Sequence, residues 1–128
     1  MSVQIATTHF LAKDGHPKLN CAQAVLKAFQ HQLNIPDNII ESFSAHGGGR
    51  APEGHCGAVF AAEFIFGLAG ILDPEVNAVT HLESLAGSAV CKDIKAAKQL
   101  SCLGCVQTCT AYVEEKLFET MSLDSMSQ

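Results

Sequence analysis

Apolar residues recur at helical spacing along most of this chain. No segment alternates apolar and polar residues with the period of two that is typical of a strand. After Asn20, for example, Cys21, Ala24, Val25 and Ala28 fall on one face of a helix. The pattern predicts an all-α fold, a compact bundle of about five or six helices.

Capping and breaking residues predict where these helices begin and end. Asn20 is a good N-cap, and Gln23 can close a capping box with it. Pro36 is expected to open a short helix with Asn34 as its cap. Further helices are expected over the first dozen residues, over 56–72, from Asp73 and Pro74 onward and over 102–121, with a looser stretch at 91–101.

The loop of residues 45–55 resists a helical assignment. Three consecutive glycines, Gly47, Gly48 and Gly49, are followed by Pro52 and would strongly destabilise a helix interior. Glycines let the backbone approach another helix, a cofactor or an anion, so they are candidate cofactor-binding residues. The loop does not match a phosphate-binding pattern, because no strand precedes it and neither Gly-Lys-Ser nor Gly-Lys-Thr follows it.

Polar side chains in and beyond this loop leave several roles open. Arg50 could hold an anion or form only a surface ion pair. His46 and His55 could act as ligands or proton carriers, or be ordinary exposed loop residues. Glu63 is isolated in an apolar helix, where a place on a polar face or at an interface is as reasonable as catalysis.

Length and composition limit the class of protein. The 128 residues match one ordinary domain, so we expect a single domain over 1–128 with a polar tail at 122–128. A hydrophobic content of 48% excludes a disordered chain. The net charge of -5 argues against nucleic-acid binding and is compatible with a basic redox partner protein. The many apolar helices are also compatible with a homodimer.

The sequence also bears on location. The longest apolar run, 56–72, is shorter than the roughly 20 residues that span a bilayer. Met1 is not followed by the basic and then apolar regions of a signal peptide. We therefore expect no membrane insertion and a cytoplasmic protein.

Six cysteines pose the main chemical question. In a cytosolic chain of this size they more often serve metal or redox chemistry than disulfides, although free cysteine is also a common core residue. Cys21 and Cys56 are each expected at the start of a helix. There the backbone N–H groups and the helix dipole would stabilise a thiolate and lower its pKa. Such a thiolate suits a metal ligand or a nucleophile, and close helix packing is the alternative.

The other four cysteines lie in the C-terminal part of the chain. Cys102 and Cys105 form a C-x2-C pair, Cys109 follows four residues later, and Cys91 precedes them. Positions three and seven apart share a helix face, which is here also the expected core face. A buried metal site and inert packing thiols therefore fit equally well. A lone C-x2-C pair is weak evidence for zinc.

Together these motifs resemble a family described as redox-active and named after the pattern C_GCAxxG_C_C. The resemblance covers most of residues 17–118. It rests on residues 20–26 around Cys21, the glycine loop, residues 54–58 around Cys56, residues 91–93, and Cys102 followed by Val106. The chain departs from the family at Ala61, where the pattern has a glycine.

The resemblance implies a four-thiolate site formed by Cys21, Cys56, Cys91 and Cys102, with Cys105 and Cys109 as additional cysteines. The family domain is similar to a part of split-Soret cytochromes associated with an iron–sulfur cluster, so such a cluster is the first candidate occupant. The chain has no C-x-x-C-H motif, so haem attachment is not implied.

Three hypotheses follow. In the first, the four thiolates hold an iron–sulfur cluster for electron transfer or redox sensing. In the second, no metal is bound and Cys102 and Cys105, or another pair, cycle between thiol and disulfide. In the third, the cysteines only pack, or bind zinc, in a structural module. The sequence supports no specific enzymatic reaction, and catalytic residues stay unknown.

Overall fold

The computed structural model describes residues 2–12, 19–46, 54–71, 76–97 and 100–126. Within these ranges the chain is helical, with no strand and one isolated antiparallel bridge between His55 and Val90. This confirms the predicted all-α class. The helices are α1 (Ser2–Phe10), α2 (Cys21–Ala28), α3 (Gln30–Leu33), α4 (Asp37–Ser42), the 3-10 helix η1 (Phe43–His46), α5 (Gly57–Leu68), α6 (Ala78–Ala86), α7 (Cys91–Ala97) and α8 (Cys102–Met126).

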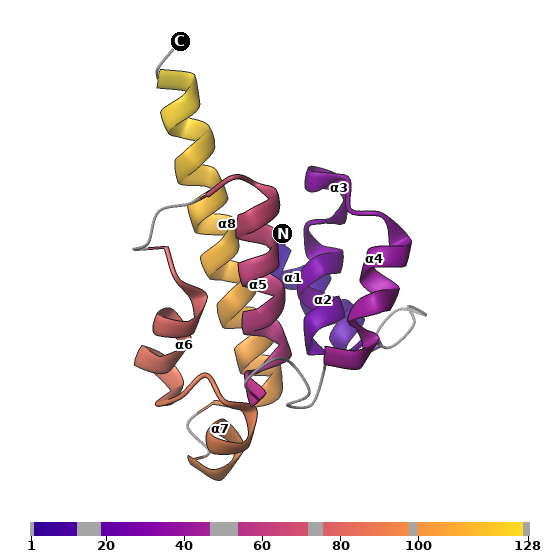
Figure 1. Ribbon diagram of the computed structural model, residues 1–128, viewed down its shortest axis with the longest axis vertical. Coiled ribbons are helices and arrows are strands. Elements are labelled where there is room, and N and C mark those ends of the chain that lie inside the picture. Colours follow the sequence, from indigo (N-terminus) through magenta and orange to yellow (C-terminus); the bar gives the residue numbers. More distant parts are fainter. Residues whose placement is uncertain (1, 13–18, 47–53, 72–75, 98–99, 127–128) are drawn as a thin grey trace.

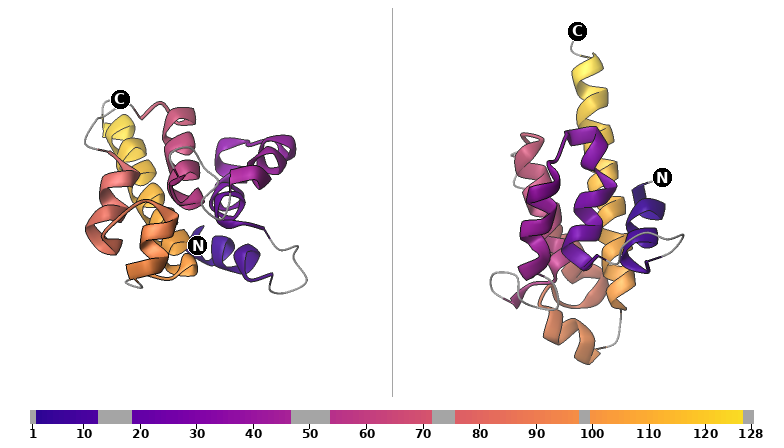
Figure 2. Two further views of the ribbon diagram at one scale, coloured as in Figure 1. Left: turned by 60° about the horizontal axis from the view of Figure 1, so that its bottom comes forward. Right: turned by 90° about the vertical axis from the view of Figure 1, so that its right-hand side faces the viewer.

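Helices α2, α5 and α8 form the centre of the bundle and run along the long axis of the molecule (Figure 1). Helix α1 packs against α2 and α8, α4 and η1 lie beside α2, and α6 packs against α5 and α8. Figure 2 shows this arrangement from two further sides. Small residues let the central helices approach closely: Ala58, Ala61 and Ala62 of α5 are all buried. The core therefore accommodates the methyl group of Ala61, where the family pattern has a glycine.

The start of α2 is fixed by the capping box that the sequence predicts. The Asn20 side-chain oxygen accepts the Gln23 backbone N–H at 2.8 Å, and Gln23 Oε1 accepts the Asn20 N–H at 3.1 Å. Asn20 Nδ2 also donates to the carbonyls of Phe43 and Ser44, and Gln23 Nε2 donates to the carbonyl of Ile40. The box thus joins α2 to α4 and η1.

The cap predicted for α4 was wrong. Asn34 ends α3 instead, in the left-handed conformation with φ 54°, and Pro36 is the N-cap of α4. Asparagine is found both at helix starts and in left-handed helix ends, so its presence alone does not say which end it marks.

Other helix boundaries also differ from the prediction. The stretch expected to be looser contains α7, which is too short to show an apolar period; Ile94 alone is buried among its described side chains. Helix α5 ends at Leu68, followed by Gly70 in the left-handed region with φ 74°. Helix α8 continues to Met126 rather than ending near residue 121.

The predicted helix start at Asp73 and Pro74 lies outside the described residues. Helix α6 begins at Ala78, directly after its N-cap Asn77. None of the helices in the described ranges combines the length and the apolar character that crossing a membrane requires.

Candidate functional site

Helices α2, α5 and α8 begin at the same end of the bundle, the lower end in Figure 1, and each begins at a cysteine. Cys21 is the first residue of α2, Cys102 is the first residue of α8, and Cys56 is the N-cap of α5. Helix α7, which lies at this end too, begins at Cys91. We call this region, with the starts of these four helices, the cysteine end.

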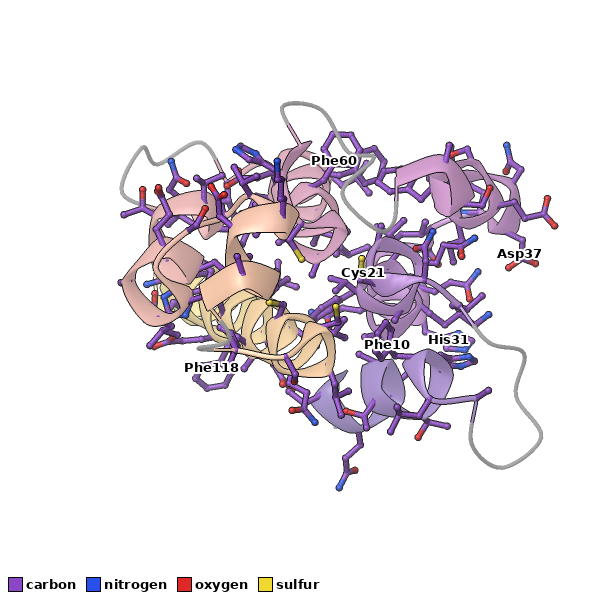
Figure 3. All side chains as sticks on the ribbon, turned by 90° about the horizontal axis from the view of Figure 1, so that it is seen from below. Phe10, Cys21, His31, Asp37, Phe60 and Phe118 are labelled. Atoms are coloured by element: carbon purple, nitrogen blue, oxygen red, sulfur yellow. The ribbon has the colours of Figure 1, made fainter. Side chains whose placement is uncertain are left out.

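Inside the cysteine end, thiols from three helices come together. The Cys56 side chain is hydrogen-bonded to both Cys21 and Cys105. Figure 3, which looks at the molecule from this end, shows Cys21 pointing from α2 toward α5. Cys109 follows one turn after Cys105 on α8, close enough to Cys21 and Cys56 to interact electrostatically. We call Cys21, Cys56, Cys105 and Cys109 the thiol cluster.

Exposure differs sharply among the cysteines. Cys56, Cys105 and Cys109 are buried, Cys21 is half-buried and Cys102 is exposed. The structure therefore joins two of the four cysteines predicted to bind metal, Cys21 and Cys56. It joins them to Cys105 and Cys109, which the family resemblance had left without a role. Cys102 lies at the outer edge, one helical turn before Cys105.

The pKa of Cys56 is raised, whereas its place at a helix start predicts a lowered pKa. The hydrogen bond with Cys105, together with burial, raises the pKa of Cys56 to about 12 and outweighs the hydrogen bond with Cys21, which lowers it. Burial likewise raises the pKa of Cys109 well above its ordinary value, with further contributions from Cys56, Cys21 and Glu63. The predicted low pKa was wrong for Cys56, because the hydrogen bond with Cys105 and burial outweigh the effect of the helix start.

A short backbone contact positions the start of α7. The Cys56 N–H donates to the carbonyl of Ala89 at 2.8 Å, beside the bridge between His55 and Val90. Cys91 follows Val90 directly, so its backbone comes alongside the segment that leads into α5. The Cys91 side chain lies outside the described part of the chain.

Several other predicted site residues lie outside that part as well. They are Gly47, Gly48, Gly49, Arg50 and the side chain of His46. Among the side chains that the structure does describe, no group of three or more Cys, His, Asp or Glu residues could hold a metal ion. The four-thiolate set therefore stays a prediction.

Glu63 has a structural partner. Its Oε1 accepts the backbone N–H of Ala78, the first residue of α6, at 2.8 Å. A carboxylate at this position satisfies a free N–H group and interacts favourably with the positive end of the helix dipole. This contact accounts for an acidic residue in the otherwise apolar α5 without a catalytic role.

Tyr112 has a structural role that no sequence pattern predicts. Its hydroxyl accepts the backbone N–H of Asn77 at 3.1 Å, just before α6. The His81 ring stacks on the Tyr112 ring, with centroids 4.0 Å apart and planes 12° apart. These contacts and that of Glu63 fasten α6 to α5 and α8.

Clustered thiols at one end of an all-helical bundle define a small cysteine protein suited to redox chemistry. The chain belongs to the family described as "Putative redox-active protein (C_GCAxxG_C_C)", whose model matches residues 19–116. This match confirms the resemblance seen in the motifs and supports a redox role. No curated protein and no solved structure matches the chain.

Proposed function

We propose that Cys21, Cys56, Cys91 and Cys102 hold an iron–sulfur cluster and that the protein acts in electron transfer or redox sensing. The observation that carries this proposal is the gathering of helix starts: each of these cysteines begins or caps a helix at the cysteine end. Four thiolates are the usual ligand set of [2Fe–2S] and [4Fe–4S] clusters, which supply one-electron transfer when bound.

The residues present fit such a group in their chemistry. Cys21 and Cys56 already contact each other through a hydrogen bond. Helices α2, α5 and α8 direct the positive ends of their dipoles toward this end, which offsets the negative charge of thiolates. Cys91 and Cys102 would complete the set: the Cys91 backbone lies beside the segment that enters α5, and Cys102 begins α8.

The test is to purify the full chain without oxygen and to measure its visible absorption, iron and acid-labile sulfide. We expect coloured protein with iron and sulfide in equal amounts. Alanine variants of Cys21, Cys56, Cys91 and Cys102 should each lose iron and visible absorption. Cys109→Ala is the matched control, because Cys109 is a buried cysteine of the same region outside the proposed ligand set. Unchanged iron content in all four ligand variants would contradict the proposal, as would colourless, metal-free protein after reconstitution.

A metal-free thiol–disulfide protein is the second candidate. It is favoured by one observation: α8 begins with an exposed cysteine, Cys102, and a buried one, Cys105, one turn later. Colourless protein in which Cys102 is alkylated rapidly near neutral pH would favour this function. Tightly held zinc without visible absorption would instead indicate a structural metal site.

A further inference from the structure

Three thiols form a continuous path from the surface into the core. Cys102 is exposed at the first residue of α8. Cys105, one turn later, is 1% exposed and hydrogen-bonded to Cys56, which is 6% exposed. Residues three apart on a helix have Cβ atoms about 5–6 Å apart, so each sulfur on this path has the next within reach.

We propose that Cys102 and Cys105 form a thiol–disulfide relay that carries oxidation from the solvent to Cys56 and ends in a disulfide between Cys56 and Cys105. The effect of this relay on metal binding rests on the proposed function, in which Cys56 is a ligand of the iron–sulfur cluster. A Cys56 sulfur bound in a disulfide cannot bind metal, so oxidation would prevent the cluster from being loaded.

The first turn of α8 is suited to this exchange. The Ser101 Oγ accepts the Gly104 N–H at 2.9 Å, and the Ser101 carbonyl accepts the Cys105 N–H at 2.9 Å. A Cβ on Gly104 would lie 2.8 Å from Leu100 Cδ1. Glycine therefore lets Leu100, which packs against the core, fold back over the turn that joins the two cysteines. Helix ends adjust more readily than helix interiors, and a disulfide needs the Cβ atoms about 1–2 Å closer than regular helix geometry gives.

The oxidant is a small aliphatic disulfide, RSSR. The Cys102 thiol attacks one of its sulfurs, forms a mixed disulfide and releases the first RSH. The Cys105 thiol then attacks the Cys102 sulfur and releases the second RSH. Finally, the Cys56 thiol attacks the Cys105 sulfur, and Cys102 leaves with the proton from Cys56. In sum, two thiols become one disulfide, two electrons reduce RSSR to two RSH, and Cys102 is regenerated.

Disulfide mapping tests the relay on the full chain after reduction and removal of metal. The protein is treated with oxidised glutathione, quenched in acid at intervals and analysed by mass spectrometry of its peptides. We expect glutathione on Cys102 first, then a Cys102–Cys105 disulfide, and finally a Cys56–Cys105 disulfide. Cys102→Ser should slow the last product at least about tenfold, because the variant lacks the exposed thiol at which the relay begins.

Three further variants sharpen this test. Cys105→Ala should stop the reaction at glutathione on Cys102, and Cys105→Ser repeats the test with a side chain closer in size to the thiol. Cys109→Ala, on the same helix, should react as the parent protein does. The relay is overturned if Cys56 is oxidised at the parent rate in Cys102→Ser. It is equally overturned if full oxidation of the parent never yields the Cys56–Cys105 disulfide.

A separate experiment measures whether oxidation prevents the cluster from being loaded. Oxidised protein should fail to take up iron and sulfide, and treatment with dithiothreitol should restore the uptake. The disulfide map is obtained without metal, so it tests the relay even if the protein proves to bind no cluster. If oxidised protein takes up iron and sulfide as well as reduced protein does, the proposed control of loading is wrong.

Discussion

Helices α5 and α8 carry two contrasting sets of polar side chains. Toward α6, the Glu63 carboxylate and the Tyr112 hydroxyl each accept a backbone N–H, those of Ala78 and Asn77. At the cysteine end, thiol contacts thiol instead. The first set satisfies backbone groups at a helix start, which the fold requires. A thiol pair contributes little to the fold, because S–H is a weak donor and sulfur a weak acceptor. The contrast separates polar groups that hold the bundle together from those available for chemistry.

Glu63→Ala should give the largest loss of stability among the changes that test this contrast. It removes the acceptor for the Ala78 N–H at the start of α6, and the free energy of unfolding should fall by about 1–3 kcal/mol. Glu63→Gln keeps a side-chain oxygen and should lose less. Urea unfolding of the three proteins measures this, and equal stability of Glu63→Ala and the parent would refute a capping role.

Asn20→Ala should cost about 1–2 kcal/mol, because it removes the N-cap of α2 and the donors to Phe43 and Ser44. The cysteine end thus has a structural polar group of its own beside its thiols. Asn20→Asp keeps the capping oxygen but loses the donors, so it should fall between the parent and Asn20→Ala in urea unfolding. Equal losses in the two variants would show that the cap itself contributes nothing.

Tyr112→Phe should cost about 1 kcal/mol, the value of one hydrogen bond. The variant loses the acceptor of the Asn77 N–H but keeps the ring that stacks on His81. Thermal unfolding followed by circular dichroism measures the change. A stabilised Tyr112→Phe variant would mean that this hydroxyl does not help to hold α6.

Cys109→Ala should cost no more than about 0.8 kcal/mol, since it removes an atom similar in size to one methylene group. Cys109 is buried, and its neighbours in the thiol cluster offer only weak hydrogen bonds. Urea unfolding of the metal-free variants compares the loss in the free energy of unfolding of Cys109→Ala with that of Glu63→Ala. A loss as large as that of Glu63→Ala would break the distinction between the two sets.

The smallest effect is expected from the protonation of His81. Burial lowers the pKa of His81 below its ordinary value of 6.5, with Lys116 acting in the same direction and Glu115 against it. The unfolded chain therefore takes up this proton at a higher pH than the folded protein does. Stability should be complete above pH 6.5 and decline as the pH falls through that value, until the folded His81 is also protonated.

The matched control is His81→Phe, which keeps an aromatic ring beside Tyr112 but does not titrate. The urea midpoints of the two proteins are compared at about pH 7.5 and about pH 5.5, on either side of the ordinary histidine pKa. The parent should lose more stability than the variant between these two conditions. An identical change in both proteins would exclude His81 as the cause.

Much of the fold follows from local sequence, because helical spacing and capping are local properties. The capping box of Asn20 and Gln23 could be predicted for this reason. Asn34 could not, since asparagine fits either end of a helix. Helix α7 was missed because a helix of two turns shows no apolar period.

The site was less predictable, because it depends on how separate helices pack. The spacing of Cys102, Cys105 and Cys109 predicts a shared face, but it does not say which other thiol that face meets. Contact between Cys56 and Cys105 depends on the rotation of α8 against α5, which no local pattern encodes. The hydrogen bond with Cys105, together with burial, raises the pKa of Cys56, against the expectation from its place at a helix start.

Because α8 is long, a small tilt of this helix at the cysteine end displaces its far end much further. This helix begins at Cys102, has 25 residues and extends beyond the other helices at its far end (Figure 1). At 1.5 Å per residue it is about 37 Å long, so a tilt of about 5° at its start moves its far end by about 3 Å. A small tilt of the turn that contains Cys102 and Cys105 would produce a larger displacement at the opposite end of α8. A rotation of α8 about its first turn would therefore be easiest to detect at its C-terminal end.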